Sequence, residues 1–208
     1  MRDLDPSPRM PSQIVGYEDV RLVSLGNGKF GASATVCDRI PSRRMIARLI
    51  LDEVGNVSLA QLMPGRQWHE KNWMPVVHEG GQIAWIYSLD PTVIIGAVDK
   101  QIACPFALDH LRGGAVVRIW GGYLAVTHEV VEANEGRLYL HRFVKLSENF
   151  QVVAVSPAWV FAHHGIEFCA GLARDGEDLV LSYGFEDREA WVMRVSAEEV
   201  RNLGWMTP

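Results

Sequence analysis

WHEKNWMPVVHEGGQIAWIYSLDP, residues 68–91, holds the pattern that the rest of the chain repeats. Glu70-Lys71-Asn72, a charged and amide triplet, stands directly before an apolar run that begins at Trp73. Gly80-Gly81 marks a tight turn, and a second apolar run follows it. Two apolar runs around a glycine turn predict a β-hairpin, and the triplet predicts a polar site at the start of its first strand.

Short apolar runs, separated by turns rich in glycine, asparagine and aspartate, continue on both sides of this hairpin. Their length and alternation predict strands, and only Glu198–Leu203 near the end predicts a helical turn. The predicted strands are Val20–Leu25, Lys29–Cys37, Met45–Leu51, Val57–Met63, Met74–Val77, Gln82–Leu89, Thr92–Ala97, Ala115–Trp120, Gly122–Val131, Arg137–Leu146, Val152–Val155, Gly165–Ala173, Leu179–Phe185 and Ala190–Val195.

The predicted strands fall into four units of roughly 40–50 residues, a repeat length typical of propeller blades. The sequence therefore predicts an all-β fold, a β-propeller with about four blades, that forms a single domain over residues 14–208. Residues 1–13 contain three prolines and no periodicity, which predicts a flexible lead-in. A β-sandwich is the structural alternative, because it is also built from short strands with frequent turns.

The composition limits the partners and the location of the protein. Of the 208 residues, 48% are hydrophobic and 22% are charged, as in a folded globular chain. A formal net charge of -5 without a basic block predicts that nucleic acid is not a partner. No apolar run reaches the roughly 20 residues of a membrane-spanning helix, so no membrane partner is expected. The start of the chain lacks the apolar core of a secretion signal, so a cytoplasmic location is expected.

The cysteines and histidines show no metal-binding pattern. Cys37, Cys104 and Cys169 are far apart and lack the spacing of metal ligands, which predicts reduced, mostly buried thiols. His163-His164 places two imidazoles together, but no third ligand stands at a diagnostic spacing. We therefore expect no metal and no cofactor.

A first cluster of charges lies at the first predicted strand. Glu18-Asp19-Val20-Arg21 places two carboxylates and a guanidinium within four positions. Strand alternation predicts that Asp19 and Arg21 lie on the same face. An arginine favours the charged form of a neighbouring carboxylate, so the two residues form either a functional pair or a simple salt bridge.

The triplet Glu70-Lys71-Asn72 is the second cluster. It lies between Trp68 and Trp73, and large aromatic side chains beside polar groups are typical of sugar-binding clefts. Both tryptophans could equally belong to the core.

Later strands carry further polar residues. His128 follows an apolar run and is either a core histidine or part of an anion site with Arg142 on the next strand. Glu167 ends a polar loop that leads into a strand, and Asp187 ends another strand as a turn-former or an acceptor for sugar hydroxyls. Propellers present strand ends around a central channel, so these side chains are predicted to converge on one cleft.

Four segments resemble motifs of family 130 of the glycoside hydrolases, which comprises the mannoside phosphorylases and related hydrolases. Residues 16–22, GYEDVRL, resemble the E-D-P-R segment, and residues 121–129, GGYLAVTHE, the G-W-L-x-x-Y-H-G strand. Residues 166–171, IEFCAG, resemble the segment ending in Cys-Gly, and residues 179–187, LVLSYGFED, the Y-Y-G-x-x-D strand. The order matches, and the resemblance covers residues 14–200.

The chain resembles more closely a divergent branch with E-K-N-W-x-P and Y-S-x-D-P, here at residues 70–75 and 87–91, which is often found beside sugar-transfer enzymes. Val20 stands where the phosphorylases have proline, and Glu129 where they have glycine. The family fold is a five-bladed propeller, whereas this chain shows about four units. We therefore expect a fragment, a compact variant, or a propeller completed by a homo-oligomer or a partner domain.

The resemblance implies an inverting glycoside phosphorylase or hydrolase that acts on β-mannoside-like glycosides, with an oligosaccharide or glycoside as substrate. Asp19 takes the position of the acid by motif match. Inorganic phosphate is the implied co-substrate of a phosphorylase, which needs cations to hold it. Arg21, Lys71, His128 and Arg142 are the candidates for that role.

The remaining predicted substrate-binding residues are Glu70, Asn72, Glu167 and Asp187, of which Asp187 would accept hydrogen bonds from sugar hydroxyls. A hydrolase would also need a base, and Glu129 or Glu167 would have to supply it. The alternative to an enzyme is a non-catalytic glycan-binding propeller associated with glycosyltransferases. A structural remnant without a ligand is the third possibility.

Overall fold

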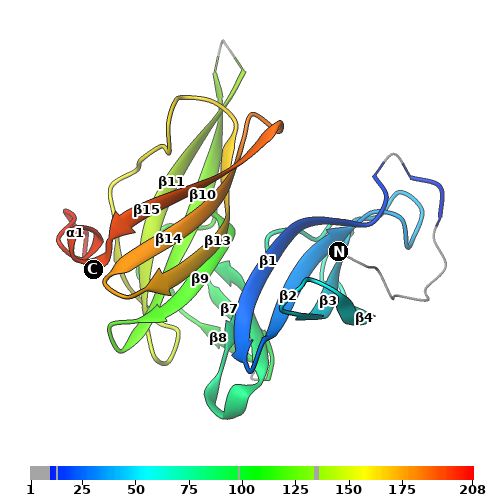
Figure 1. Ribbon diagram of the computed structural model, residues 1–208. Coiled ribbons are helices and arrows are strands. Elements are labelled where there is room, and N and C mark those ends of the chain that lie inside the picture. The colour runs from blue at the N-terminus through cyan, green and yellow to red at the C-terminus, as the bar shows by residue number, and fades with distance from the viewer. Residues whose placement is uncertain (1–9, 13, 98, 134–135) are drawn as a thin grey trace. The chain divides into compact units, whose positions relative to one another are not determined.

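The computed structural model (Figure 1) describes residues 10–12, 14–97, 99–133 and 136–208. Within these ranges the chain forms fifteen β-strands in four sheets, one 3-10 turn and one short α-helix. It divides into two compact units, residues 1–85 and 86–208, and each is described by itself.

The first sheet contains β1 (Tyr17–Gly26), β2 (Lys29–Val36), β3 (Met45–Asp52) and β4 (Val57–Leu62), in that order. Asn27-Gly28 joins β1 to β2 with two positive φ angles, 50° and 67°, as a two-residue hairpin turn requires. Burial of the alternating apolar side chains gives the sheet its own core, which consists of Ala32, Ala34, Val36, Met45, Ala47, Leu49, Leu51 and Val57.

The second sheet has the order β5 (Met74–Val77), β6 (Ile83–Leu89), β7 (Thr92–Gly96) and β8 (Lys100–Ile102). The predicted glycine turn joins β5 to β6 as a 3-10 turn (Glu79–Gly81), in which Gly80 and Gly81 have φ of 79° and 78°. The boundary between the two compact units falls within β6. The pattern of apolar residues did not predict β8, because its three residues, Lys-Gln-Ile, are too few to show alternation.

The third sheet has the order β12 (Val152–Val155), β11 (Gly136–Ser147), β10 (Gly122–Ala133) and β9 (Arg112–Ile119). The fourth has only three strands within the described residues, β13 (Glu167–Asp175), β14 (Asp178–Phe185) and β15 (Glu189–Ser196). Side chains of both sheets share one core cluster with the helix α1 (Ala197–Arg201). Ser196 caps that helix by accepting hydrogen bonds from the backbone N–H groups of Glu198 and Glu199.

All fourteen predicted strands are present, with ends displaced by a few residues. The predicted terminal helical turn is also present, although α1 begins one residue earlier and ends sooner than expected. Most of the predicted flexible lead-in lies outside the described residues. Met10, which is described, donates its backbone N–H to the carbonyl oxygen of Asp38 at 2.7 Å. The prediction of a single domain over residues 14–208 stays a prediction.

None of the helices in the described part of the chain has the length and apolar character needed to cross a membrane. Cys37, Cys104 and Cys169 are free thiols, of which Cys169 is buried and the other two are half-buried.

Candidate functional site

A β-bulge in β1 determines where Asp19 points. Glu18 pairs with Thr35 of β2, but the next paired residue of β1 is Arg21, opposite Ser33. Two residues of β1, Asp19 and Val20, therefore lie opposite one residue of β2. Asp19 has a left-handed φ of 50°, a conformation that aspartate tolerates better than most side chains. The bulge places Arg21 on the face of Glu18 and interrupts the alternation from which Asp19 and Arg21 were predicted to share a face, so that prediction stays a prediction.

Arg21 connects this bulge to the triplet Glu70-Lys71-Asn72 by hydrogen bonds. Its side chain is 2% exposed and donates hydrogen bonds to the backbone carbonyl of Asp19 and to Oδ1 of Asn72, both at 2.8 Å. Asn72 itself has a left-handed φ of 64°. These contacts give Arg21 a positioning role, since its guanidinium is occupied by protein oxygens.

The side chain of Glu70 binds the backbone of the segment that precedes β5. Its carboxylate is buried and accepts hydrogen bonds from the backbone N–H groups of Arg66 and Gln67, the latter at 2.6 Å. It also accepts one from Nε1 of Trp73 at 3.1 Å, and Trp73 is fully buried. The carboxylate of Glu70 thus holds the loop together, and its predicted role in substrate binding stays a prediction.

The remaining members of the triplet face the bulge. The ammonium of Lys71 lies 3.7 Å from Oδ2 of Asp19, and these side chains are 35% and 22% exposed. Ser33 of β2 donates its hydroxyl to the carbonyl of Trp73 at 2.6 Å, which fixes the start of β5 against β2. Asp19, Lys71 and Asn72 therefore meet at one partly exposed site, held from behind by Arg21 and Glu70.

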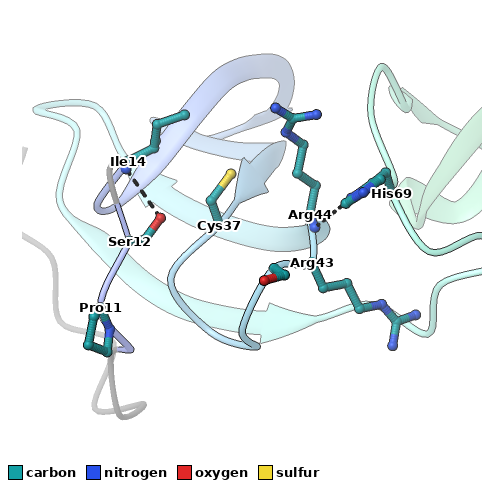
Figure 2. Close-up of a pocket in the computed structure, with 8 residues that line it drawn as sticks. Pro11, Ser12, Ile14, Cys37, Arg43, Arg44 and His69 are labelled. Carbon is teal, nitrogen blue, oxygen red and sulfur yellow. Dashed lines mark hydrogen bonds between the residues drawn. The ribbon is translucent and has the colours of Figure 1, made fainter.

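A pocket of about 430 Å³ opens in the same unit (Figure 2). It is lined by Pro11, Ser12, Ile14, Cys37, Ser42, Arg43, Arg44 and His69. In Figure 2 the two arginine side chains leave the chain in opposite directions. The backbone N–H of Arg44 donates to Nδ1 of His69 at 3.3 Å. This hydrogen bond joins the residue before β3 to the residue before Glu70.

Cys37 connects this pocket to the bulge. Its thiol lies 3.8 Å from Oε2 of Glu18. Burial, and then the charge of Glu18, raise the pKa of the Cys37 thiol, while the cations of Arg44 and Lys71 oppose that rise. All three charged groups therefore act on the Cys37 thiol, which also lines the pocket. The pocket itself is lined by the cationic residues Arg43 and Arg44, a composition suited to an anion.

We expect Glu70→Gln to lower the free energy of unfolding by about 1–3 kcal/mol, because the amide cannot accept all three N–H groups and leaves buried donors unpaired. Urea unfolding followed by circular dichroism measures the change. Glu53→Gln, at an exposed turn, is the matched control and should unfold like the wild type. Equal stability of the Glu70→Gln and Glu53→Gln proteins would contradict the assignment of Glu70.

The second unit contains a separate polar cluster around Glu129. One carboxylate oxygen of Glu129 lies 3.5 Å from the guanidinium of Arg142, and the other lies 3.7 Å from Nε2 of His110. Arg142 also donates to the carbonyl of Ser156 at 3.2 Å. Arg142 is thus paired with an acid, and its predicted role in binding an anion stays a prediction.

His128 and His141 stand opposite each other on β10 and β11 and belong to an aromatic stack. The ring of His128 is 4% exposed and stacks on Tyr139 at a centroid distance of 5.4 Å. The fully buried ring of His141 packs 5.1 Å from Trp159 and 4.8 Å from Phe161. His128 therefore has the surroundings of a core histidine, the alternative that the sequence left open.

Within the described part of the chain, neither ring nitrogen of His141 has a partner in hydrogen-bond geometry. Burial lowers the pKa of His141 to about 4, and the charge of Glu167 and the backbone of Trp159 offset this lowering only in part. The ring is neutral in the folded protein at neutral pH. An unfolded chain takes up a proton on this residue near pH 6.5.

The stability of the protein should fall as the pH drops from 6.5 to about 4, because the unfolded His141 binds a proton that the folded one does not. Between pH 6.5 and about 4, this residue lowers the free energy of unfolding by about 3 kcal/mol at most. His141→Leu should remove that part of the slope. Urea unfolding at a series of pH values measures it, with exposed His164→Gln as control. An unchanged slope in His141→Leu would refute the assignment.

Glu167 repeats the arrangement of Glu70 in the second unit. Its fully buried carboxylate accepts backbone N–H groups of Phe161, Ala162 and His163 at 2.7, 2.9 and 3.1 Å. His163 bridges it to a second acid, with Nε2 2.8 Å from Oε1 of Glu186. The oxygens of Glu167 are thus engaged by the backbone, and its predicted role as a substrate-binding residue or base stays a prediction.

Asp187 lies in the turn between β14 and β15. It is exposed and, like the preceding Glu186, has a left-handed φ, 51° and 53° respectively. The turn is closed by the N–H of Arg188, which donates to the carbonyl of Phe185 at 3.0 Å. This geometry matches the turn-forming role that the sequence offered as one alternative, and the sugar-binding role stays a prediction.

Of the predicted site residues, the structure brings Asp19, Arg21, Lys71 and Asn72 together in the first unit. The other predicted residues of the cleft, apart from Glu70, lie in the second unit, and their convergence with the first group on one channel stays a prediction. Sequence reasoning missed Arg44 and Cys37 as neighbours of the site. The Arg43-Arg44 doublet before a strand was the available signal. In the described ranges no group of three histidine, cysteine or acidic side chains is placed to hold a metal ion.

No protein-family model matches the chain, and no curated protein matches it in sequence. Solved structures do match. A β-1,2-mannobiose phosphorylase from Listeria innocua has a TM-score of 0.64 and 14% identity over 89% of this chain and 60% of its own. A glycosyl hydrolase from Bacteroides ovatus has a TM-score of 0.58 and 12% identity over 88% and 66%. A GDP-Man-dependent mannosyltransferase from Leishmania mexicana has a TM-score of 0.52 and 14% identity over 92% and 71%.

These similarities define the class of fold: an all-β propeller of the glycosidase type. The predicted resemblance to the mannoside phosphorylases is confirmed at the level of the fold, with four sheets standing for four blades. The β-sandwich alternative is thereby set aside. The chain spans about 60% of the length of the phosphorylase.

Proposed function

We propose that the chain acts on glycosides at the site formed by Asp19, Lys71 and Asn72, with Asp19 as general acid. One observation carries the proposal: the carboxylate of Asp19, at a bulge, is partly exposed and lies 3.7 Å from the Lys71 ammonium, in the unit whose pocket is lined by Arg43 and Arg44. The similarity in fold to a β-1,2-mannobiose phosphorylase favours β-mannoside-like glycosides as the substrate class.

In the proposed inverting step, the carboxyl of Asp19 donates its proton to the glycosidic oxygen while the bond from C1 to that oxygen breaks. A phosphate oxygen forms the new bond to C1 from the opposite face, and Asp19 is left as a carboxylate. Lys71 and Arg44 would hold the phosphate. A phosphate dianion would attract the Lys71 ammonium away from Asp19 and leave that carboxyl group free to face the glycosidic oxygen.

Phosphorolysis suits the arrangement of acids better than hydrolysis does. Hydrolysis needs a second carboxylate that activates water, and the oxygens of Glu167 are taken up by three backbone N–H groups. Glu129 is the remaining candidate for a base, and it is paired with Arg142 and His110. Phosphate needs no such base because it is already a nucleophile. Inorganic phosphate is therefore the proposed co-substrate, and no other cofactor is invoked.

Asp19→Asn should lower the phosphate-dependent release of sugar 1-phosphate from β-1,2-mannobiose by roughly 10²–10⁴-fold, because the amide cannot donate the proton. Chromatography of the products measures the rate. Asp109→Asn, whose carboxylate is 81% exposed, should leave the rate unchanged. Wild-type activity in the Asp19→Asn protein would remove Asp19 from the role of acid.

Lys71→Met should raise the KM for phosphate about tenfold or more while changing the KM for the glycoside little, because in the proposed step the ammonium binds the phosphate and not the glycoside. Initial rates at varied phosphate concentration give both constants. Lys100→Met, on exposed β8, is the control. An unchanged KM for phosphate would show that Lys71 serves only to pair with Asp19.

A non-catalytic glycan-binding propeller is the second candidate function. The ion pair between Asp19 and Lys71 favours it, because the carboxylate is engaged by an ammonium and is not left free to face a glycosidic oxygen. The similarity in fold to a mannosyltransferase is compatible with an association with sugar-transfer enzymes. Titration calorimetry that shows glycan binding without turnover, equal in wild type and Asp19→Asn, would support this function over the enzyme.

A further inference from the structure

The open edge of β15 carries an inference that goes beyond the proposed function. Three of the four sheets have four strands, whereas the sheet β13-β14-β15 has three within the described residues. β15 pairs with β14 along its whole length without a register shift. In the described part of the chain, its other edge therefore presents the unpaired backbone N–H and carbonyl groups of an eight-residue strand.

The last strand of each other sheet is protected from association. β8 has only three residues. β12 has four, and its Val155 exchanges backbone hydrogen bonds with Met206. β4 pairs with β3 across a register shift between Ile50 and Leu51. Short strands, bulges and covering segments are the usual means by which proteins keep sheet edges apart, and among the described residues β15 has none of them.

The side chains of β15 do not protect the edge either. Trp191 and Val192 are 47% and 69% exposed, and the strand contains no proline or lysine. Its two charged residues have partners within the same chain. Arg194 binds Asp178 at 2.9 Å as well as Asp175, and the carboxylate of Glu189 accepts from Nε1 of Trp191 at 2.7 Å.

We propose that β15 pairs with β15 of a second copy of this chain, which makes the protein a symmetric dimer through one continuous six-stranded sheet. A two-fold axis perpendicular to the sheet leaves equivalent side chains of the two copies on the same face of the sheet. Paired residues of the two strands must therefore be an even number of positions apart in the sequence. Centring the axis on Val192 places Trp191 against Met193 of the other copy and Val192 against Val192. Each of these central pairs is apolar, and no like charges oppose each other.

The neighbouring registers are less favourable. An axis at Trp191 would place Arg188 opposite Arg194, and like charges directly opposite destabilise a strand pair. An axis at Met193 would place Val192 opposite Arg194 and would bring Glu189 opposite Ala197, which already belongs to α1. The sequence of β15 is therefore most complementary to itself in the register centred on Val192.

Sedimentation velocity at high micromolar concentration tests the dimer, and a species of twice the chain mass is expected. Val192→Lys should raise the dimer dissociation constant at least about tenfold, because it places two ammonium groups together on the axis. Val153→Lys is the matched control, since Val153 is a 40% exposed valine on β12. It should leave the dimer unchanged.

A cysteine scan tests the register. Val192→Cys should form a disulfide between copies on mild oxidation, identified by mass spectrometry as a peptide joined to its own copy at position 192. Ala190→Cys should not, because the two residues at position 190 would stand about 14 Å apart along the strands. A monomeric wild type, a dimer that Val192→Lys leaves intact, or equal cross-linking at both positions would each overturn the proposal.

Discussion

The site in the first unit depends on one buried carboxylate. Glu70 accepts two backbone N–H groups of the loop before it and the indole N–H of Trp73 after it. A buried carboxylate is costly unless such donors surround it, so the loop must close around Glu70 in one conformation. That conformation turns Lys71 and Asn72 outward, toward the bulge of Asp19. The chemistry proposed for the site therefore rests on a residue that touches no ligand.

The same device occurs again in the second unit. Glu167, at the start of β13, accepts three consecutive backbone N–H groups from the loop before it. In both places an irregular segment leads into the first strand of a sheet and would otherwise leave buried donors unpaired. A glutamate at the end of such a loop accepts hydrogen bonds from these donors. The two units thus repeat a structural solution as well as a strand pattern, although the sequences around the two glutamates differ.

The strands could be predicted from the sequence because alternation and glycine turns are local signals. The position of Asp19 could not, because a bulge shifts the register by one residue and interrupts the alternation on which the prediction relied. The contacts of Glu70 and Glu167 with the backbone were also missed, since the sequence does not distinguish a glutamate that binds backbone N–H groups from one that binds substrate. Arg44 and Cys37 were missed because only the folded chain brings them to Glu18 and Lys71.

The most direct test of this account is the affinity for inorganic phosphate of the wild-type and Glu70→Gln proteins, measured by titration calorimetry at a temperature where both are folded. If the buried carboxylate positions Lys71, the variant should bind phosphate about tenfold more weakly or worse, while Glu53→Gln binds like the wild type. Equal affinity of wild type and Glu70→Gln, or no phosphate binding by the wild type, would contradict the account.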